Sequence, residues 1–140
     1  MTILKANLFL DATALKTITI PGSITEIGLG AFHNTTALHT VVFEANTQLA
    51  RIESEAFLNS GIESLVVPRH VYHIGAFAFS GTTHLEEITF LRATDASDYS
   101  HNMLLNTNPD IIVYVPDDAY EFYYFELFGH ETFQFIRLSD

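Results

Sequence analysis

Apolar and polar residues alternate in short stretches that recur along the chain. In residues 15–20, Ile18 and Ile20 alternate with threonines, a pattern typical of a half-buried β-strand. Pro21 ends this predicted strand, because proline cannot donate a hydrogen bond to a ladder. Residues 24–27 carry a second pair of apolar residues and predict a short extended segment on the opposite side of the structure.

Three Ala-Phe pairs show that this arrangement is a sequence repeat. They end at Phe32, Phe57 and Phe79, and each Phe has aliphatic residues five and eight positions before it. The period is about 23 residues, and the units begin near Leu15, Leu38, Ile62 and Leu85, with a partial unit at residues 1–14. A unit of this length cannot bury its own apolar face, so the units are predicted to stack around one continuous core.

The repeat is less regular toward both ends of the chain. Met1, Leu4 and Phe9 fit repeat positions, so the chain is expected to begin within a unit. Downstream, Leu105 is assigned to the Phe position, and Leu91–Met103 is expected to be an insertion that forms a flexible loop. Each Ala-Phe piece is predicted to form one turn of helix before a polar turn reverses the chain.

The repeat resembles the BspA-like leucine-rich repeats, a family of surface proteins of certain bacteria and parasitic protists. The segments that carry the resemblance are Leu15–Phe32, Ile62–Phe79 and the tail Val113–Phe128. The family often has Cys in the turn after Ala-Phe, where this chain has Asn34-Thr35-Thr36 or Gly81-Thr82-Thr83. The resemblance implies a right-handed leucine-rich-repeat solenoid with a strand and a short helix or turn in each repeat. It also implies protein binding or adhesion, in a cell-surface or secreted protein.

Residues 1–116 are assigned to leucine-rich repeats, and residues 117–140 to a C-terminal helical cap and a final strand. Asp118 and Glu121 fit a capping box at the start of a helix, and Gly129 fits its end. The helix is predicted to cover the last repeat with one aromatic face, although the same face could be a patch that binds a partner. That face comprises Tyr120, Tyr123, Tyr124, Leu127 and Phe128.

The first unit carries no cap in this chain. An open strand edge and core end favour association with another chain. Either the chain is a piece of a longer array, or a partner protects the open face. If this is the whole chain, two copies are expected to form a homodimer through the first repeat. Residues 1–5 do not begin a signal peptide, because no basic start precedes a long apolar stretch.

Composition and charge exclude several classes of function. The chain is 48% apolar and 16% charged, which indicates a folded domain. Its net charge is −11, and only six Lys and Arg are present, so nucleic-acid binding and adsorption to anionic membranes are excluded. Residues 85–140 hold eleven acids against two bases. The absence of cysteine excludes disulfides, zinc ribbons and a thiol nucleophile.

The candidate chemical motifs do not indicate an enzyme. His70 and His73 form only a pair, whereas zinc normally takes three or four protein ligands. Asp117 and Asp118 are adjacent, whereas the two carboxylates of a glycosidase oppose each other across a cleft. No catalytic residue, metal or cofactor is therefore predicted. The histidines are expected to be solvent-exposed turn residues: His33, His39, His70, His73, His84, His101 and His130.

The outward face of the main sheet is the candidate partner-binding surface. It is small, of mixed polarity and low in charge at its centre, which suits protein recognition. The alternative is a solvated sheet face that carries Thr and Val for their β-propensity. The candidate residues are Thr17, Thr19, Thr40, Val42, Ser64, Val66, Glu87, Thr89 and Tyr114.

These residues predict a non-catalytic protein-recognition or adhesion module, with a protein as its partner. The alternative function is a structural spacer or terminal cap of a longer repeat array with no ligand of its own. On the opposite side of the repeats, Glu26, Arg51 and His73 fall in one column. Glu26 and Arg51 are expected to form a surface ion pair, worth about 0–1 kcal/mol.

Overall fold

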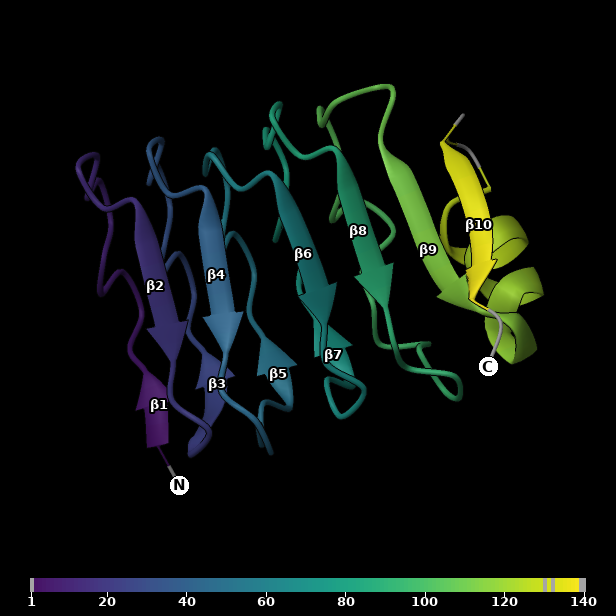
Figure 1. The fold of residues 1–140 in the computed structure, drawn as a ribbon, viewed down its shortest axis with the longest axis horizontal. Coiled ribbons are helices and arrows are strands. Elements are labelled where there is room, and N and C mark those ends of the chain that lie inside the picture. Colours follow the sequence, from purple (N-terminus) through teal and green to yellow (C-terminus); the bar gives the residue numbers. More distant parts are fainter. Residues whose placement is uncertain (1, 130, 132, 139–140) are drawn as a thin grey trace.

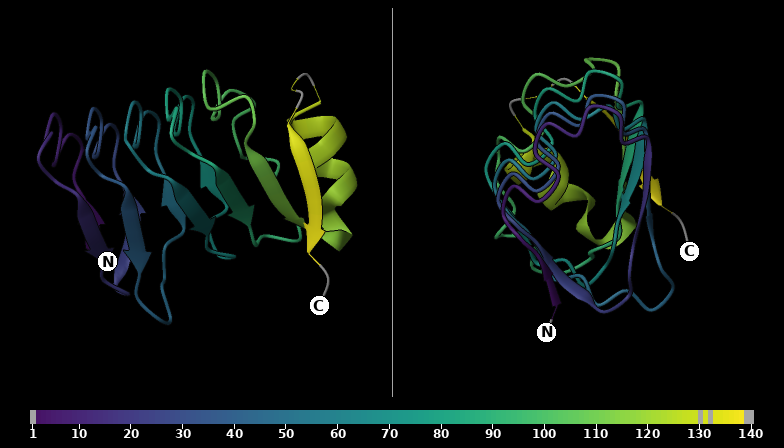
Figure 2. Two further views of the ribbon diagram at one scale, coloured as in Figure 1. Left: turned by 45° about the horizontal axis from the view of Figure 1, so that its top comes forward. Right: turned by 90° about the vertical axis from the view of Figure 1, so that its left-hand side faces the viewer.

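Two ladders of short parallel strands run along the molecule, one on each side of a continuous core (Figures 1 and 2). A computed structural model describes residues 2–129, 131 and 133–138. The front ladder contains β2 (Thr17–Ile20), β4 (Thr40–Phe43), β6 (Ser64–Val67), β8 (Glu87–Phe90), β9 (Ile112–Pro116) and β10 (Gln134–Leu138). The back ladder contains β1 (Thr2–Leu4), β3 (Ile24–Ile27), β5 (Arg51–Ile52) and β7 (His73–Ile74). The chain therefore winds as a β-solenoid, and we call each winding a coil.

Alternation along each strand decides which residues reach the core. In β6, Leu65 and Val67 are buried, whereas Ser64 and Val66 are exposed. Leu65 pairs in register with Ile88 of β8, so residues of one kind stack in columns from coil to coil. The predicted stacking around a continuous core is confirmed.

A stack of phenylalanine rings runs through this core. Its neighbouring ring centroids lie 5.2, 5.0 and 5.6 Å apart, in the order Phe9, Phe32, Phe57 and Phe79. Such aromatic pairs each contribute about 0.5–1.5 kcal/mol beyond the burial of their area. The next residue in the column is Leu104, which is 2% exposed, whereas Leu105 is 39% exposed. The assignment of Leu105 to the Phe position is therefore wrong by one residue.

The Ala-Phe pieces form hydrogen-bonded turns, and the predicted turn of helix is wrong. The reason is a residue with positive φ two positions after each Phe, because a left-handed residue interrupts a right-handed helix. Asn34 also donates from Nδ2 to Asp11 Oδ1, and Asn59 donates from Nδ2 to Asn34 Oδ1. This column of positive φ contains Asp11, Asn34, Asn59, Gly81 and Asn106.

The segment Leu91–Met103 forms another coil, and its prediction as a loop insertion is wrong. Tyr99 forms a parallel bridge with Ile74, so it continues the column of the back ladder. Ala96 and Tyr99 are 4% and 2% exposed, like the buried aliphatic pairs of the three preceding coils, Ile24 and Ile27, Leu49 and Ile52, and Val71 and Ile74. Sequence alignment missed this coil because an aromatic residue takes the place of an isoleucine.

The predicted C-terminal capping helix is not present as an α-helix. Instead, the structure has a 3-10 turn, η1 (Asp117–Ala119), and a six-residue π-helix, η2 (Phe122–Leu127). Pro116 precedes η1, and neither element has a side-chain cap hydrogen bond, so the predicted capping box of Asp118 and Glu121 is also wrong. The Phe128 amide donates to the Tyr123 carbonyl, which is the i→i−5 bond of a π-helix.

The π-helical bonding changes which aromatic residues share a face. Tyr123, Leu127 and Phe128 are buried, and the Tyr123 ring stacks on Phe90 of β8 at 5.2 Å. Tyr124, predicted on the same face, is 40% exposed, and Phe125 is 63% exposed. Tyr123, Leu127 and Phe128 therefore pack on the last coils, as predicted for that face.

The final strand is β10, which pairs in parallel with β9. Its Arg137 forms an ion pair with Asp117 at 3.0 Å and lies over the Tyr120 ring at 4.1 Å. These contacts link β10 to the beginning of the helical segment at the C-terminal end of the array. Figure 2 shows β10 beside this segment. At the other end, Leu4 pairs with Ile27 as the repeat predicts, whereas Met1 lies outside the described residues.

Candidate recognition face

The candidate residues of the front ladder lie side by side on its outer face. Thr17 pairs with Thr40, and Thr19 pairs with Val42. Farther along, Ser64 pairs with Glu87, Val66 pairs with Thr89, and Thr89 pairs with Tyr114. We call the outer surface of the front ladder, formed by these residues, the recognition face. Strand pairing within β2–β4 and within β6–β8–β9–β10, together with packing on the core, preorganises the face.

Two valines make the centre of the recognition face apolar. Val42 is 48% exposed and Val66 is 51% exposed, so both valines are accessible to a partner. Thr89 and Tyr114 are half-buried. Ile136 of β10 pairs with Tyr114 and extends the face by one strand. Ile136 was not among the predicted residues of the face, although its position in a strand of alternating residues could have indicated it.

The front ladder is interrupted between β4 and β6. β4 pairs only with β2, and β6 pairs only with β8, among the residues that the structure describes. The Glu63 amide still donates to the His39 carbonyl at 3.3 Å, so the strands meet where they begin. Figure 1 shows the two strands diverging toward their C-terminal ends. We call this interruption the seam.

Irregular spacing in the sequence coincides with the seam. Val41 follows Phe32 by nine positions, but Leu65 follows Phe57 by only eight positions. In addition, the link between β4 and Leu49 is two residues longer than the link between β6 and Val71. The shortened turn before β6 and the longer link after β4 thus lie on either side of the seam in the sequence.

The seam opens into an apolar groove of about 470 Å³. Val41 and Phe43 are inward-facing residues of β4, yet both are only half-buried. Their counterparts in β6, Leu65 and Val67, are 4% and 0% exposed. The groove therefore reaches the edge of the core. Its lining is Val41, Val42, Phe43, Glu44, Ala45, Asn46, Thr47, Ser64, Leu65, Val66, Pro68 and Leu91.

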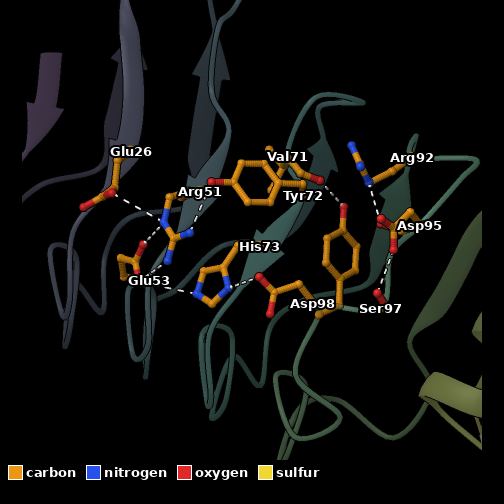
Figure 3. Close-up of polar contacts among 11 residues, drawn as sticks. Glu26, Arg51, Glu53, Val71, Tyr72, His73, Arg92, Asp95, Ser97 and Asp98 are labelled. Atoms are coloured by element: carbon orange, nitrogen blue, oxygen red, sulfur yellow. Dashed lines mark hydrogen bonds and ion pairs between the residues drawn. The ribbon is translucent and has the colours of Figure 1, made fainter. Parts of the chain in front are cut away.

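On the back ladder, a chain of alternating charges crosses successive coils (Figure 3). Arg51 Nε lies 3.6 Å from Glu26 Oε1, which confirms the predicted ion pair, and 2.7 Å from Glu53 Oε2. His73 Nε2 lies 3.4 Å from Glu53 Oε1, and its Nδ1 lies 2.9 Å from Asp98 Oδ2. Residues 26, 51 and 73 pair in register, so the predicted column is also confirmed.

Hydrogen bonds in this chain raise the pKa of Arg51. The bond to Glu53 has the largest effect, followed by the bond that Arg51 donates to the Tyr72 hydroxyl. Arg51 therefore carries a fixed positive charge between carboxylates. Because these side chains are partly exposed, water screens the pairs, and each contributes only about 0–1 kcal/mol to stability.

The histidines do not gather into a metal site. Among residues 2–129, 131 and 133–138, no group of three or more His, Cys, Asp or Glu is arranged to hold a metal ion. His73 departs from the expected exposed turn residue, because it lies in β7 and contacts Glu53 and Asp98. His130 lies outside the described residues. His39, His70, His84 and His101 are exposed, and His33 is half-buried.

Two buried tyrosines have perturbed acidity. Burial raises the pKa of both Tyr99 and Tyr123 above its ordinary value. The Tyr99 hydroxyl donates to the Val71 carbonyl at 2.7 Å, and the Tyr123 hydroxyl donates to the Arg92 carbonyl at 2.9 Å. Their hydroxyls therefore satisfy main-chain carbonyls that the coils would otherwise leave unpaired, which is a structural role.

The repeat geometry agrees with a known protein family. The model of the BspA type leucine rich repeat region, in six copies, matches residues 2–124. The chain belongs to this family. The recognition of the family from the repeat is therefore confirmed, and the six copies include the coil that contains Tyr99.

Two solved structures share the fold. One is a leucine rich cell surface protein from Faecalibacterium prausnitzii, with a TM-score of 0.60 and 20% identity over 81% of this chain. The other is the pneumococcal vaccine antigen PcpA, with a TM-score of 0.65 and 15% identity over 96% of this chain. The matches cover 39% and 38% of those proteins, so this chain spans well under half of their length.

Other comparisons add less. No curated protein matches the chain. Within the described part of the chain, no helix is both long and apolar enough to cross a membrane.

Proposed function

We propose that this chain is a non-catalytic protein-recognition or adhesion module that binds a protein partner through the recognition face. The observation that carries the proposal is the exposure of Val42 and Val66 at the centre of an otherwise ordered sheet. A face of mixed apolar and hydroxyl side chains is compatible with a non-obligate protein interface, which as a whole is about as apolar as the rest of a protein surface. A preorganised sheet also loses little entropy on binding.

We further propose that the module acts on the cell surface. Family membership and the printed description of the Faecalibacterium protein as a cell surface protein support this location. In this arrangement, the η1 and η2 segment and β10 cap one end of the array, because Tyr123, Leu127 and Phe128 cover the core there. The recognition face remains open along the side of the array.

The test uses beads coated with the chain and a panel of immobilised matrix and serum proteins. Wild-type beads are compared with beads carrying Val42→Lys and Val66→Lys, because a lysine at the centre of the interface introduces a desolvation cost. The control is Thr83→Lys, which adds the same charge at an exposed turn residue outside the face. Circular dichroism confirms that the variants fold.

Retention of wild-type and Thr83→Lys beads, with loss for the double valine variant, is the expected result. Equal retention of all three kinds of bead would contradict the proposal. It would favour the alternative function, a spacer or terminal cap of a longer array.

A further inference from the structure

The seam leaves two strand edges without a partner strand in the middle of the recognition face. The Glu44 amide, directly after β4, donates to the Ile20 carbonyl. The main-chain groups of every second residue counted back from Glu44 therefore point toward β2. Successive main-chain groups of a strand alternate between its two edges, so the groups of Val41 and Phe43 point toward the seam. Free edges of this kind accept an extended peptide as an added strand.

The groove beside these edges can hold an apolar side chain. Its volume of about 470 Å³ lies within the range of specific ligand pockets. Half-buried Val41 and Phe43 form one wall, and Leu65 and Val66 form the other. An apolar anchor placed here would complete the burial of β4, which the interrupted ladder leaves unfinished.

Acidic side chains near the groove favour a bound segment that carries Lys or Arg beside its apolar residue. Glu44 belongs to the lining, and its Oε1 accepts a hydrogen bond from the Gly22 amide at 2.9 Å. Glu63 precedes Ser64 of the lining, and Glu87 pairs in register with Ser64. In the described part of the chain, these three glutamates take part in no ion pair. Arg69 follows Pro68 of the lining in the sequence, but it does not line the groove.

We propose that the seam is the specificity site of the recognition face, and that it binds an extended segment of a partner protein with an apolar anchor residue next to Lys or Arg. The anchor fills the groove between β4 and β6. The main chain of the segment pairs with a free strand edge, and its cationic side chains lie against Glu63 and Glu87. This inference rests on the proposed function and names the kind of partner.

The experiment measures binding to synthetic extended peptides by fluorescence anisotropy. Each peptide carries a central Leu or Phe between threonines, and the series places Lys, Glu or Gln beside the centre. The wild-type chain is expected to bind the Lys-flanked peptides at least tenfold more tightly than the Glu-flanked peptides. Replacing the central apolar residue by Ser should abolish binding.

Three variants locate the site. Ala45→Trp fills the groove and should weaken binding at least tenfold, because Ala45 is exposed and lines the groove. The charge reversal of Glu63→Lys with Glu87→Lys should invert the preference toward Glu-flanked peptides. Thr83→Lys is the matched control, because Thr83 is an exposed turn residue outside both the recognition face and the groove. It should bind as the wild type does.

The results separate this inference from the proposed function. If peptides bind and neither Ala45→Trp nor the two glutamate substitutions changes their binding, while the bead assay depends on Val42 and Val66, the recognition face is active but the seam is not its specificity site. If no peptide of the series binds, the seam inference is overturned, and the bead assay still decides the proposed function. Inversion of the charge preference by the two glutamate substitutions supports the inference even if Ala45→Trp fails to fold.

Discussion

Gly81 lies directly against Asn59 of the preceding coil. Its φ is +70°, and a Cβ at Gly81 would lie 2.0 Å from Asn59 Oδ1. Asn59 also has a positive φ, of 58°, and it is hydrogen-bonded to Asn34. This column therefore needs both a left-handed backbone and a small residue at position 81.

Gly81→Ala should destabilise the chain by about 1–3 kcal/mol. Alanine loses energy in the left-handed region and also displaces the Asn59 amide. Urea unfolding of the variant measures the change in the free energy of unfolding. Gly22→Ala is the control, since Gly22 has an ordinary φ and a Cβ there meets no atom closer than 3.4 Å. Equal stability of the two variants would show that the contact with Asn59 carries no cost.

Removing a buried hydroxyl should have opposite consequences in equivalent turns. Thr35 Oγ1 donates to the Phe32 carbonyl at 2.7 Å, and Thr82 Oγ1 donates to the Phe79 carbonyl at 2.6 Å. Ser60 occupies the same place after Phe57, but its buried Oγ has no hydrogen-bond partner among the residues that the structure describes. Thr35→Ser and Thr82→Ser should retain the bond, whereas Thr35→Val and Thr82→Val should cost about 1–3 kcal/mol.

Ser60→Ala, in contrast, should be neutral or stabilising by about 1 kcal/mol, because it removes a desolvated hydroxyl that forms no bond. Thermal and urea unfolding of the variants measure the difference. A loss of stability for Ser60→Ala as large as that for Thr35→Val would contradict the assignment of Ser60 as unsatisfied.

Alkaline pH should unfold the chain through its buried tyrosines. The pKa of Tyr99 and Tyr123 is raised by burial, whereas in the unfolded chain each titrates near pH 10. Their contribution to stability is therefore fully present below about pH 10 and is lost as the pH rises above it, because the unfolded state releases protons first. Urea midpoints measured between about pH 8 and pH 12 should fall steeply above pH 10.

The double variant Tyr99→Phe with Tyr123→Phe separates this effect from general alkaline damage. At neutral pH it should lose about 1–3 kcal/mol for the two hydrogen bonds to main-chain carbonyls. Its urea midpoint should nevertheless change less above pH 10 than that of the wild type. The surface variant Tyr124→Phe serves as the control, and an unchanged slope in the double variant would be evidence against the mechanism.

The first coil should make this 140-residue chain associate. Ile3, Leu8 and Leu10 are 40%, 49% and 41% exposed, and Leu4 and Phe9 are only partly buried. We therefore propose a homodimer through this coil, seen as a mass that rises with concentration in light scattering. Leu8→Glu with Leu10→Glu should give a monomer at every concentration. Leu105→Glu, at an exposed leucine in a later coil, should not change the mass.

Periodicity predicted the parts of the fold that depend on burial. The columns of Ile, Leu and Phe were readable because every coil needs an apolar residue at the same place, so both ladders and the Glu26–Arg51 pair followed from alignment. The coil around Tyr99 was missed, because Tyr99 fills an isoleucine position and Leu104 fills a phenylalanine position. Substitution between residues of similar volume hides a repeat from a pattern of residue types.

Features that depend on backbone geometry could not be read in the same way. The π-helical bonding of η2 rests on one main-chain bond between Phe128 and Tyr123, and an amphipathic pattern does not distinguish it from an α-helix. The seam coincides with a turn that is one residue shorter. The spacing showed this shorter turn, but it did not show that β4 and β6 fail to pair. The outward positions of Val42 and Val66 were predictable, whereas the groove between their strands was not.

The seam also has a mechanical consequence. Between the coil of β4 and the coil of β6, the back ladder continues from Arg51 to His73 and the rings of Phe57 and Phe79 remain stacked, while the front ladder stops. The array is thus joined less extensively on its front side at this point, where the Glu63–His39 hydrogen bond links only the beginnings of the two strands. A load pulling along the array should bend it there and separate the first two strands of the front ladder from the rest. Traction on an attached partner would then widen the very groove that holds it.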